Sequence, residues 1–345
     1  MTYGIFEDFD IRKVKGLNEP VESVLVKRIA AVAEKLRVED LGGDELELAA
    51  LQNRLGRTLL SLGDAVTAVP LLTKARDSRL RLLGPDHPDT LGSMGNLAEG
   101  YKAAGQLDKA LPLLEETLKL RKAKRGPDHP DTLASMGNLA GGYKAAGQLD
   151  KALPLYEETF TLSKAKLGPN HIDTLASMGN LGEAYAEARQ GDKAAKTLSA
   201  FITGMRKRFP KDSPQFAGLL AQVSIELLKC DQFAAAEEML RESLAIRQKT
   251  QPDAWTTFNA QSMLGEALLG QKKYKDAEPL LLKGYEGMKA REKAIPLQGA
   301  TRIPEALDRL IGLYTAMKKP DEVKKHRAER AKYPPEPAPA PRPVR

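Results

Sequence analysis

Three histidines of this sequence recur at a constant spacing that first suggests a metal site. His87, His129 and His171 lie 42 residues apart, and each begins the motif HPDTL or HIDTL. Neutral imidazole is a common zinc ligand, so three converging histidines would hold a zinc ion. Equivalent residues of stacked repeats form a row instead, with neighbours roughly 8 to 10 Å apart. We therefore expect no metal site and interpret these histidines as turn and cap residues.

The other residues capable of covalent or acid–base chemistry have no suitable partner in the sequence. Cys230 is the only cysteine, and no histidine lies in its own repeat, which favours a small buried thiol over a nucleophile. The acidic pairs Glu115-Glu116 and Glu157-Glu158 are adjacent, so their side chains leave a helix in different directions and indicate solvated surface. The sequence thus predicts no catalytic residue, no cofactor and no enzyme.

Composition narrows the range of partners. The chain has 345 residues, and its 53 Lys and Arg exceed its 46 Asp and Glu by only seven charges. Aromatic residues make up 5% of the chain, which leaves little surface for stacking single-stranded nucleic acid. No window of about 18 uncharged apolar residues occurs, as a membrane-spanning helix would need. We expect no nucleic-acid partner and no membrane segment, with the cytoplasm as the default compartment.

An internal repeat organises the chain. Residues 87–118 and 129–160 are identical at 28 of 32 aligned positions. The same period extends backward to residues 45–86 and forward to Val323, with the turn glycine moved to Gly191 and one residue deleted further on. The sequence therefore predicts about seven repeat units, because fixed-period self-similarity is the mark of a repeat protein.

Each unit has the pattern of a helix hairpin. Apolar residues recur at intervals of three and four between Leu91 and Tyr101, and again between Leu107 and Leu118. Gly105 stands between the two runs and marks the turn. Ahead of the first run, Asp86 has the place of a capping side chain before a proline in the first turn.

The spacing of the core residues resembles that of the tetratricopeptide repeat, with Met in the tryptophan place and Leu in the phenylalanine place. In this chain it reads Met94-x2-Leu97-Ala98-x2-Tyr101, then Ala110-x3-Leu114. The 42-residue units, the GPDHPDTL linkers and the NLA cores are similar to the repeats of kinesin light chains. The resemblance implies an all-α fold, a right-handed α-solenoid of about seven helix hairpins.

A second likeness covers more of the chain. The segments LQNRLGRTLLSLG and WTTFNAQSMLGEALLGQKKYKDAEPLLLKGYEGMKAREKAIP resemble the repeat region that follows the catalytic domain in certain bacterial serine/threonine protein kinases. The sequence itself lacks the Gly-rich phosphate loop, the VAIK-like lysine, the HRD loop and the DFG motif of a kinase. This likeness implies a kinase-associated repeat module rather than a kinase.

The repeats divide the chain into expected segments. The order is an N-terminal extension at 1–20, a capping helix at 21–40, high-identity tetratricopeptide repeats at 41–212, degenerate repeats at 213–332, and a Pro-rich disordered tail at 333–345.

The strongest indication of function comes from the first helix of each hairpin. The face of these helices that is not used for packing lines the concave side of a solenoid. Asn96, Asn138 and Asn180 recur there, and Arg54 and Gln222 occupy the same register in the flanking units. Asparagine offers both a donor and an acceptor, as a peptide backbone does. In tetratricopeptide and kinesin light chain repeats, asparagines at the matching place contact the backbone of the bound peptide.

Small and charged residues surround this row of amides. Five glycines remove side chains from the same surface and predict a wide groove. The Asn and Gly residues would equally allow close packing between units. The glycines are Gly92, Gly95, Gly137, Gly141 and Gly179. The basic residues at one end favour acidic groups or a free carboxylate on the partner, with ordinary solvated charge as the alternative. These basic residues are Arg54, Arg57, Lys102 and Lys144, and Glu99 and Glu183 interrupt them.

We therefore expect a non-enzymatic protein–protein interaction scaffold that binds a peptide segment of a partner in the concave groove. The expected groove residues are Arg54, Arg57, Asn96, Lys102, Asn138, Lys144, Asn180 and Gln222. The alternative is a regulatory or sensor fragment of a serine/threonine kinase whose catalytic domain is absent from this chain. Self-association of the chain stays open in either case.

Overall fold

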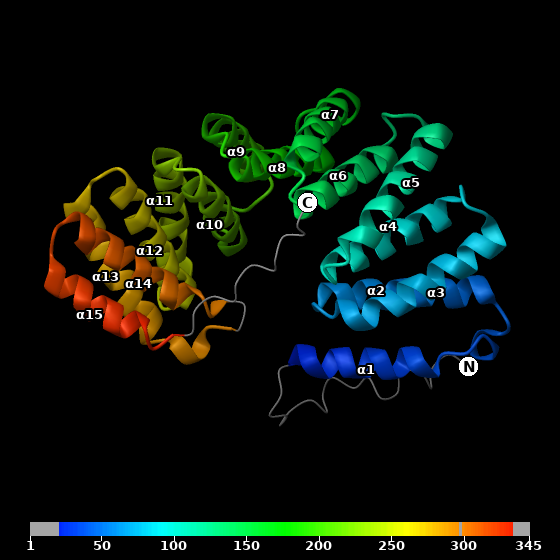
Figure 1. Ribbon diagram of the computed structural model, residues 1–345, viewed down its shortest axis with the longest axis horizontal. Helices are drawn as coiled ribbons and strands as arrows, with labels where there is room; N and C mark the ends of the chain where they lie inside the picture. Colours follow the sequence, from blue (N-terminus) through cyan, green and yellow to red (C-terminus); the bar gives the residue numbers. More distant parts are fainter. Residues whose placement is uncertain (1–20, 297–298, 334–345) are drawn as a thin grey trace. The chain divides into compact units, whose positions relative to one another are not determined.

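The computed structural model describes residues 21–296 and 299–333, and it is all-α over these ranges. The chain divides into two compact units, Met1–Lys166 and Leu167–Arg345, which we describe separately (Figure 1). The expected extension at 1–20 and the Pro-rich tail lie outside the described residues, apart from Tyr333.

The first unit begins with a single helix, α1 (Val21–Lys35), and a short 3-10 turn, η3 (Glu39–Leu41). Helix α1 lies within the segment 21–40. Three helix hairpins follow: α2 (Glu45–Ser61) with α3 (Ala65–Leu83), α4 (Pro88–Ala103) with α5 (Leu107–Arg125), and α6 (Pro130–Ala145) with α7 (Leu149–Leu167). Helix α3 packs on α4, and α5 on α6, so neighbouring hairpins share their apolar sides.

The second unit contains four hairpins and a 3-10 turn, η4 (Glu292–Ala294). The hairpins are α8 (Ile172–Glu187) with α9 (Gly191–Arg206), α10 (Pro214–Lys229) with α11 (Phe233–Thr250), α12 (Trp255–Gly270) with α13 (Tyr274–Lys289), and α14 (Arg302–Ala316) with α15 (Pro320–Arg330). The described chain thus has seven hairpins in tandem, which confirms the predicted α-solenoid of helix hairpins.

Histidine side chains cap three of the first helices. The Nδ1 atom of His87 accepts a hydrogen bond from the backbone N–H of Asp89 at 3.2 Å, and His129 and His171 do the same at 3.1 and 3.2 Å. Their role as turn and cap residues is confirmed. The prediction that Asp86 caps the helix is wrong, because His87 is the cap residue of α4.

Asp86 instead joins the two ends of its own hairpin. Its carboxylate lies 2.6 Å from the Nζ atom of Lys124 in the last turn of α5, and Asp128 and Lys166 repeat this contact at 2.9 Å in the next hairpin. The hydrogen bond and charge of the lysine lower the pKa of both aspartates. The two helices of a hairpin are antiparallel, so this ion pair closes the open end opposite the turn.

The turn between the two helices of each hairpin requires one left-handed residue. Gly63, Gly105 and Gly147 hold this place in the first unit, with φ of 83°, 72° and 71°. In the second unit this position is held by residues with a side chain, namely Arg189, Asp231, Lys272 and Lys318, with φ between 56° and 62°. The turn glycine has therefore not moved to Gly191, which is the first residue of α9.

A glycine at one of these turns should stabilise the protein. Lys272 is exposed and left-handed, a conformation that costs roughly 1 to 2 kcal/mol for a residue with Cβ. Because glycine also gains freedom in the unfolded chain, we expect Lys272→Gly to raise the free energy of unfolding by about 0.5 to 1 kcal/mol. Denaturant unfolding measures the change. The control Lys275→Gly, in the exposed first turn of α13, should lower stability, and equal effects of the two changes would contradict the explanation.

Candidate functional site

The amide row on the first helices begins with a contact inside the chain. Asn96 on α4 donates from Nδ2 to Oδ1 of Asn53 on α2 at 3.0 Å. Asn53 is buried and Asn96 is half-buried. Asn96 is therefore held in place by its neighbour, with its own Oδ1 left as an acceptor for another group.

The other amides of the row are exposed. Asn138 lies on α6 in the first unit, whereas Asn180 and Gln222 lie on α8 and α10 in the second. Helices α4 and α6 are neighbours, as are α8 and α10, so each unit carries two amides on adjacent first helices. No described residue bonds to the side chains of Asn138, Asn180 or Gln222. Their donors and acceptors are available to a partner.

The glycines near these amides fall into two groups. At Gly92, Gly95 and Gly137, a Cβ atom would meet no described atom within 4 Å, so these glycines leave open surface and are not needed for packing. At Gly179, a Cβ atom would lie 3.4 Å from the Phe201 ring, and at Gly141 it would lie 3.4 Å from the Tyr156 hydroxyl oxygen. The first group therefore leaves open surface, whereas the second lies at ordinary contact distance from neighbouring side chains.

A different set of glycines allows the two helices of a hairpin to touch. A Cβ atom on Gly182 would lie 2.6 Å from the Leu198 side chain, and one on Gly265 would lie 2.5 Å from Leu281. In the repeat register these positions match Gly56 and Ala98. Close packing thus belongs to this buried position and not to the strip beside the asparagines.

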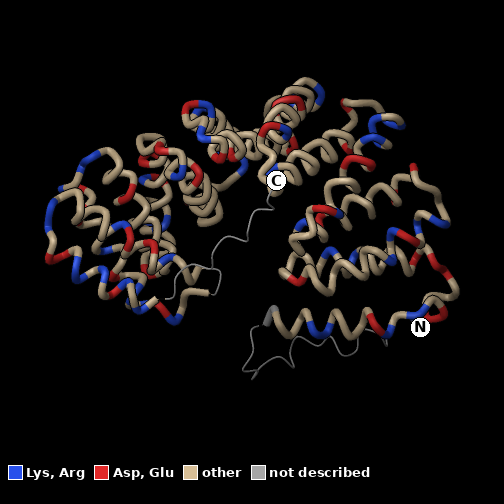
Figure 2. Tube along the Cα trace, in the orientation of Figure 1, with Lys and Arg blue, Asp and Glu red and all other residues tan. Residues whose placement is uncertain are grey.

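The predicted basic residues differ in their surroundings. Arg54 and Arg57 are exposed on α2, whereas Lys102 is bound to Glu99 on its own helix at 2.6 Å. Lys144 is half-buried. Basic and acidic residues are interspersed along the helices of both units (Figure 2). Among these four basic residues, the two exposed ones therefore both lie on α2.

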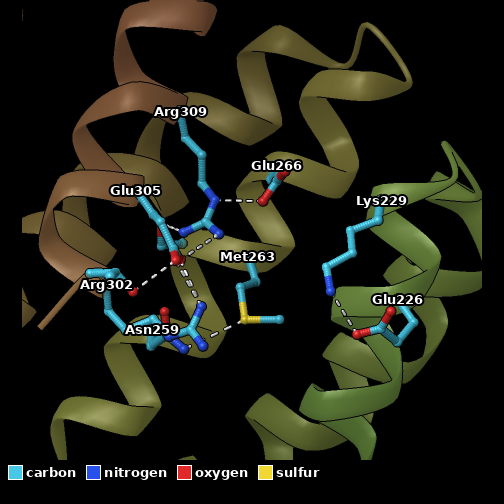
Figure 3. A network of polar contacts seen from close by, with 10 residues as sticks. Glu226, Lys229, Asn259, Met263, Glu266, Arg302, Glu305 and Arg309 are labelled. Carbon is cyan, nitrogen blue, oxygen red and sulfur yellow. Dashed lines mark hydrogen bonds and ion pairs between the residues drawn. The ribbon is translucent and has the colours of Figure 1, made fainter. Parts of the chain in front are cut away.

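The structure shows a polar network that sequence reasoning missed. The register of Asn180 and Gln222 continues after 41 residues to Met263 on α12. After a further, longer step of 46 residues it reaches Arg309 on α14. Arg309 forms an ion pair with Glu266 and donates to Ser262 Oγ at 3.2 Å (Figure 3). Extending the register beyond Gln222 would have found it.

Further contacts close this network on the α14 side. Glu305 lies 3.5 Å from Arg309 and 2.8 Å from Arg302 (Figure 3). Asn259, one turn before Met263, donates to the Met263 sulfur at 3.5 Å. The charges of these residues are matched within the chain. The last hairpins thus present a neutralised polar surface where the middle hairpins present open amides.

A pocket of about 650 Å³ lies on the last hairpin and was not predicted. Its apolar part consists of Tyr314, Pro320 and Val323, and Lys319 on its rim bonds to Glu278 at 3.1 Å. The remaining lining residues are Thr315, Lys318, Lys324 and Arg327.

The residues weighed for catalysis and metal binding lie apart. Among the described residues, no group of three or more His, Cys, Asp or Glu side chains could hold a metal ion. Cys230 is buried and its thiol donates to the backbone oxygen of Glu226 at 3.3 Å. Burial raises the pKa of this thiol, which keeps it protonated. This environment confirms the prediction of a buried thiol.

Comparison with protein families shows to which class of protein this chain belongs. A family described as tetratricopeptide repeat matches residues 47–123, 93–165 and 131–200, and a second model of the same description matches 217–250. Together these matches cover more than half of the chain. The chain belongs to the tetratricopeptide repeat proteins.

Solved structures agree with this assignment. A putative kinesin light chain with nearly identical repeats from Podosopora anserina is 29% identical, with 60% of this chain and 98% of that chain covered and a TM-score of 0.52. BtubC (BKLC) from P. vanneervenii is 21% identical, covers 67% of this chain and 92% of its own, and has a TM-score of 0.52.

Aspartyl phosphate phosphatase F from Bacillus subtilis is 12% identical, covers 93% of this chain and 86% of its own, and has a TM-score of 0.57. At these identities, phosphatase F and BtubC share the fold alone with this chain. A search of curated protein sequences gives no match. None of the described helices is both long enough and apolar enough to cross a bilayer.

Proposed function

We propose that this chain is a non-enzymatic scaffold that binds an extended peptide segment of a partner protein along the first helices of its hairpins. One observation carries the proposal: in α6, the exposed amide of Asn138 follows Gly137, where a Cβ atom would meet no described atom. In α4, Gly95 leaves the same open space beside Asn96, whose Nδ2 is bonded to Asn53. A strip that combines open space with hydrogen-bonding amides suits another polypeptide.

The spacing of the helices supports an extended partner. Adjacent packed helices lie roughly 8 to 10 Å apart, and an extended chain rises about 3.3 Å per residue. Within each unit, the two amides would therefore meet peptide groups about three residues apart on a bound strand. Each amide donates to a carbonyl and accepts from an N–H group, so binding depends little on the partner's side chains.

The exposed cations at the start of the row favour a partner that carries negatively charged groups. Arg54 and Arg57 are one turn apart on α2, and both are exposed. Guanidinium groups form charge-assisted, often bidentate hydrogen bonds with carboxylates. Acidic residues or the free carboxylate of the partner would bind here. The alternative function, a regulatory module of a kinase encoded elsewhere, rests on resemblance alone and is tested by the genes beside this one.

Removing the amides should weaken peptide binding and leave the fold intact. Peptides selected from a random library on the intact chain would be titrated against the double variant Asn138→Ala, Asn180→Ala. A hydrogen bond contributes about 0.5 to 1.5 kcal/mol, so two lost amides should weaken binding about 10- to 100-fold. Helix content and melting temperature should not change, because both side chains are exposed and unbonded within the described chain.

The matched control is Gln248→Ala, which removes an exposed amide from a second helix, α11. It should leave the affinity unchanged. An affinity of the double variant equal to that of the unmodified chain would exclude the amide row as the binding surface. Failure of the library to yield any binding peptide would exclude the proposed function itself.

A further inference from the structure

Arg247 on α11 in the second unit is a buried cation without a described acidic partner. Its side chain is buried, with 8% of the residue exposed. Its only described hydrogen bond runs from Nη1 to the Thr256 hydroxyl oxygen at 2.7 Å, and the buried Nε has no partner. A buried charge is normally paired, because leaving water without a counter-charge is strongly unfavourable.

The equivalent arginine of an earlier repeat shows what Arg247 lacks. Arg121, three periods before Arg247, donates from Nη1 to the Asp131 backbone oxygen at 2.8 Å and to Ser135 Oγ at 2.9 Å. Burial lowers the pKa of Arg121, and the nearby Asp131 carboxylate opposes this effect. In α12 the same two register positions hold Thr256 and Ala260, so both the acid and the second hydroxyl are missing.

The free side of the guanidinium group has a defined geometry. Nη1 is occupied by Thr256 and the unpaired Nε is enclosed by the protein, which leaves Nη2 as the donor that a partner can reach. Guanidinium N–H groups form charge-assisted hydrogen bonds with carboxylates. Arg247 therefore retains a donor that suits a carboxylate.

A glycine leaves Nη2 open toward the amide row. At Gly218 on α10, a Cβ atom would lie 3.8 Å from Nη2 of Arg247, and no other described atom would lie within 4 Å of it. Gly218 precedes Gln222 by four residues, so both lie on the same face of the helix. The guanidinium group thus borders the strip to which Gln222 belongs.

We propose that Arg247 binds a carboxylate group of the peptide partner, which enters over Gly218 and accepts a hydrogen bond from Nη2. This inference rests on the proposed function, since it places an anion-binding point beside the amide row. It adds a specificity for acidic groups in the second unit, separate from Arg54 and Arg57 on α2. The carboxylate belongs either to an acidic side chain or to the C-terminus of the partner.

Three short peptides separate these sources. The probes are acetyl-AAEAA-amide, acetyl-AAAAA with a free carboxylate, and the neutral acetyl-AAQAA-amide, titrated into the full chain at constant ionic strength. The readout is the ¹⁵N–¹H signal of the Arg247 Nε–H group, assigned by its loss in Arg247→Met. We expect this signal to shift with at least one carboxylate probe and not with the neutral one. The probe that acts identifies the source.

Variants test whether Arg247 serves binding or structure. Arg247→Met keeps the apolar stem and removes the charge, and Gly218→Leu covers Nη2. Both should lower the affinity for the active carboxylate probe at least tenfold. The melting temperature of Arg247→Met should stay level or rise, because an unpaired buried charge is removed. Arg121→Met, by contrast, should lower it, since that arginine bonds to α6.

The outcomes are distinct. An unshifted Nε–H signal with both carboxylate probes, or a fall in melting temperature for Arg247→Met as large as that for Arg121→Met, would overturn the proposal. The variant Lys324→Gln, Arg327→Gln at the pocket of the last hairpin controls for general attraction. If it lost as much affinity as Arg247→Met, the carboxylate would bind elsewhere. Library peptides that still depend on Asn138 and Asn180 would then leave the proposed function standing.

Discussion

Replacing Gly284 with alanine should destabilise the second unit by about 2 to 3 kcal/mol, the largest effect we expect from a single methyl group. A Cβ atom at Gly284 on α13 would lie 2.7 Å from the backbone nitrogen of Ser262 and 2.8 Å from the backbone oxygen of Phe258. Both atoms belong to the backbone of α12, so no side-chain rotation can relieve the clash. The two helices would have to move apart and loosen the core around them.

Gly312 provides the matched control for this change. It lies in α14, and a Cβ atom there would be 3.7 Å from the Leu269 side chain, an ordinary contact. Alanine is favoured over glycine inside a helix by about 1 kcal/mol, so Gly312→Ala should leave stability unchanged or raise it. Denaturant unfolding of both variants gives the comparison. A loss below about 0.5 kcal/mol for Gly284→Ala would contradict the described packing of α12 on α13.

The second large effect concerns Glu237 and depends on pH. This carboxylate on α11 accepts hydrogen bonds from Gln271 at 2.7 Å, Lys273 at 3.0 Å and Arg241 at 2.8 Å. Partial burial alone would raise its pKa, but these three donors outweigh burial and lower the pKa of Glu237 to about 2. Gln271 and Lys273 lie in the turn between α12 and α13, so their hydrogen bonds hold this turn against α11.

The lowered pKa determines the sign of the pH dependence. The ionised form is favoured by folding, so its contribution is complete above the unfolded value of 4.5 and is lost as the pH falls toward 2. Allowing for screening by solvent, we expect Glu237→Gln to lose about 1.5 kcal/mol of stability at pH 7. The difference from the unmodified chain should shrink steadily below about pH 4.5.

Glu238 supplies the control for Glu237. It is the next residue on α11, it is exposed, and no described residue bonds to it. Glu238→Gln should therefore leave stability unchanged at both pH values. Urea unfolding at pH 7 and pH 3 measures both variants. A deficit of Glu237→Gln that is equal at the two pH values would show that the carboxylate does not act through its charge.

Much of the fold followed from local patterns. The apolar period between Leu91 and Tyr101, and its repetition every 42 residues, predicted the hairpins because helix formation depends on residues three and four apart. Two local details were wrong. His87 and not Asp86 caps α4, since a histidine nitrogen accepted the backbone N–H, and Arg189 rather than a glycine holds the left-handed turn position.

The candidate site could be predicted only in part. The register placed Asn138 and Gln222 on first helices, and both side chains are exposed there. It did not reveal that Asn96 bonds to Asn53, 43 residues away, because that contact exists only when α2 and α4 are packed. Nor did it distinguish the open glycines from those that meet a leucine of the partner helix.

The sequence by itself determined the repeat length, the helix hairpins and the row of amides, since each depends on spacing within one unit. The tertiary structure alone decided which polar groups remain without partners. Arg121 and Arg247 occupy the same register, yet only the packing of α10, α11 and α12 shows that Arg247 is buried, lacks an acid and lies next to Gly218. Burial and pairing depend on residues distant in sequence, and no pattern within one repeat contains them.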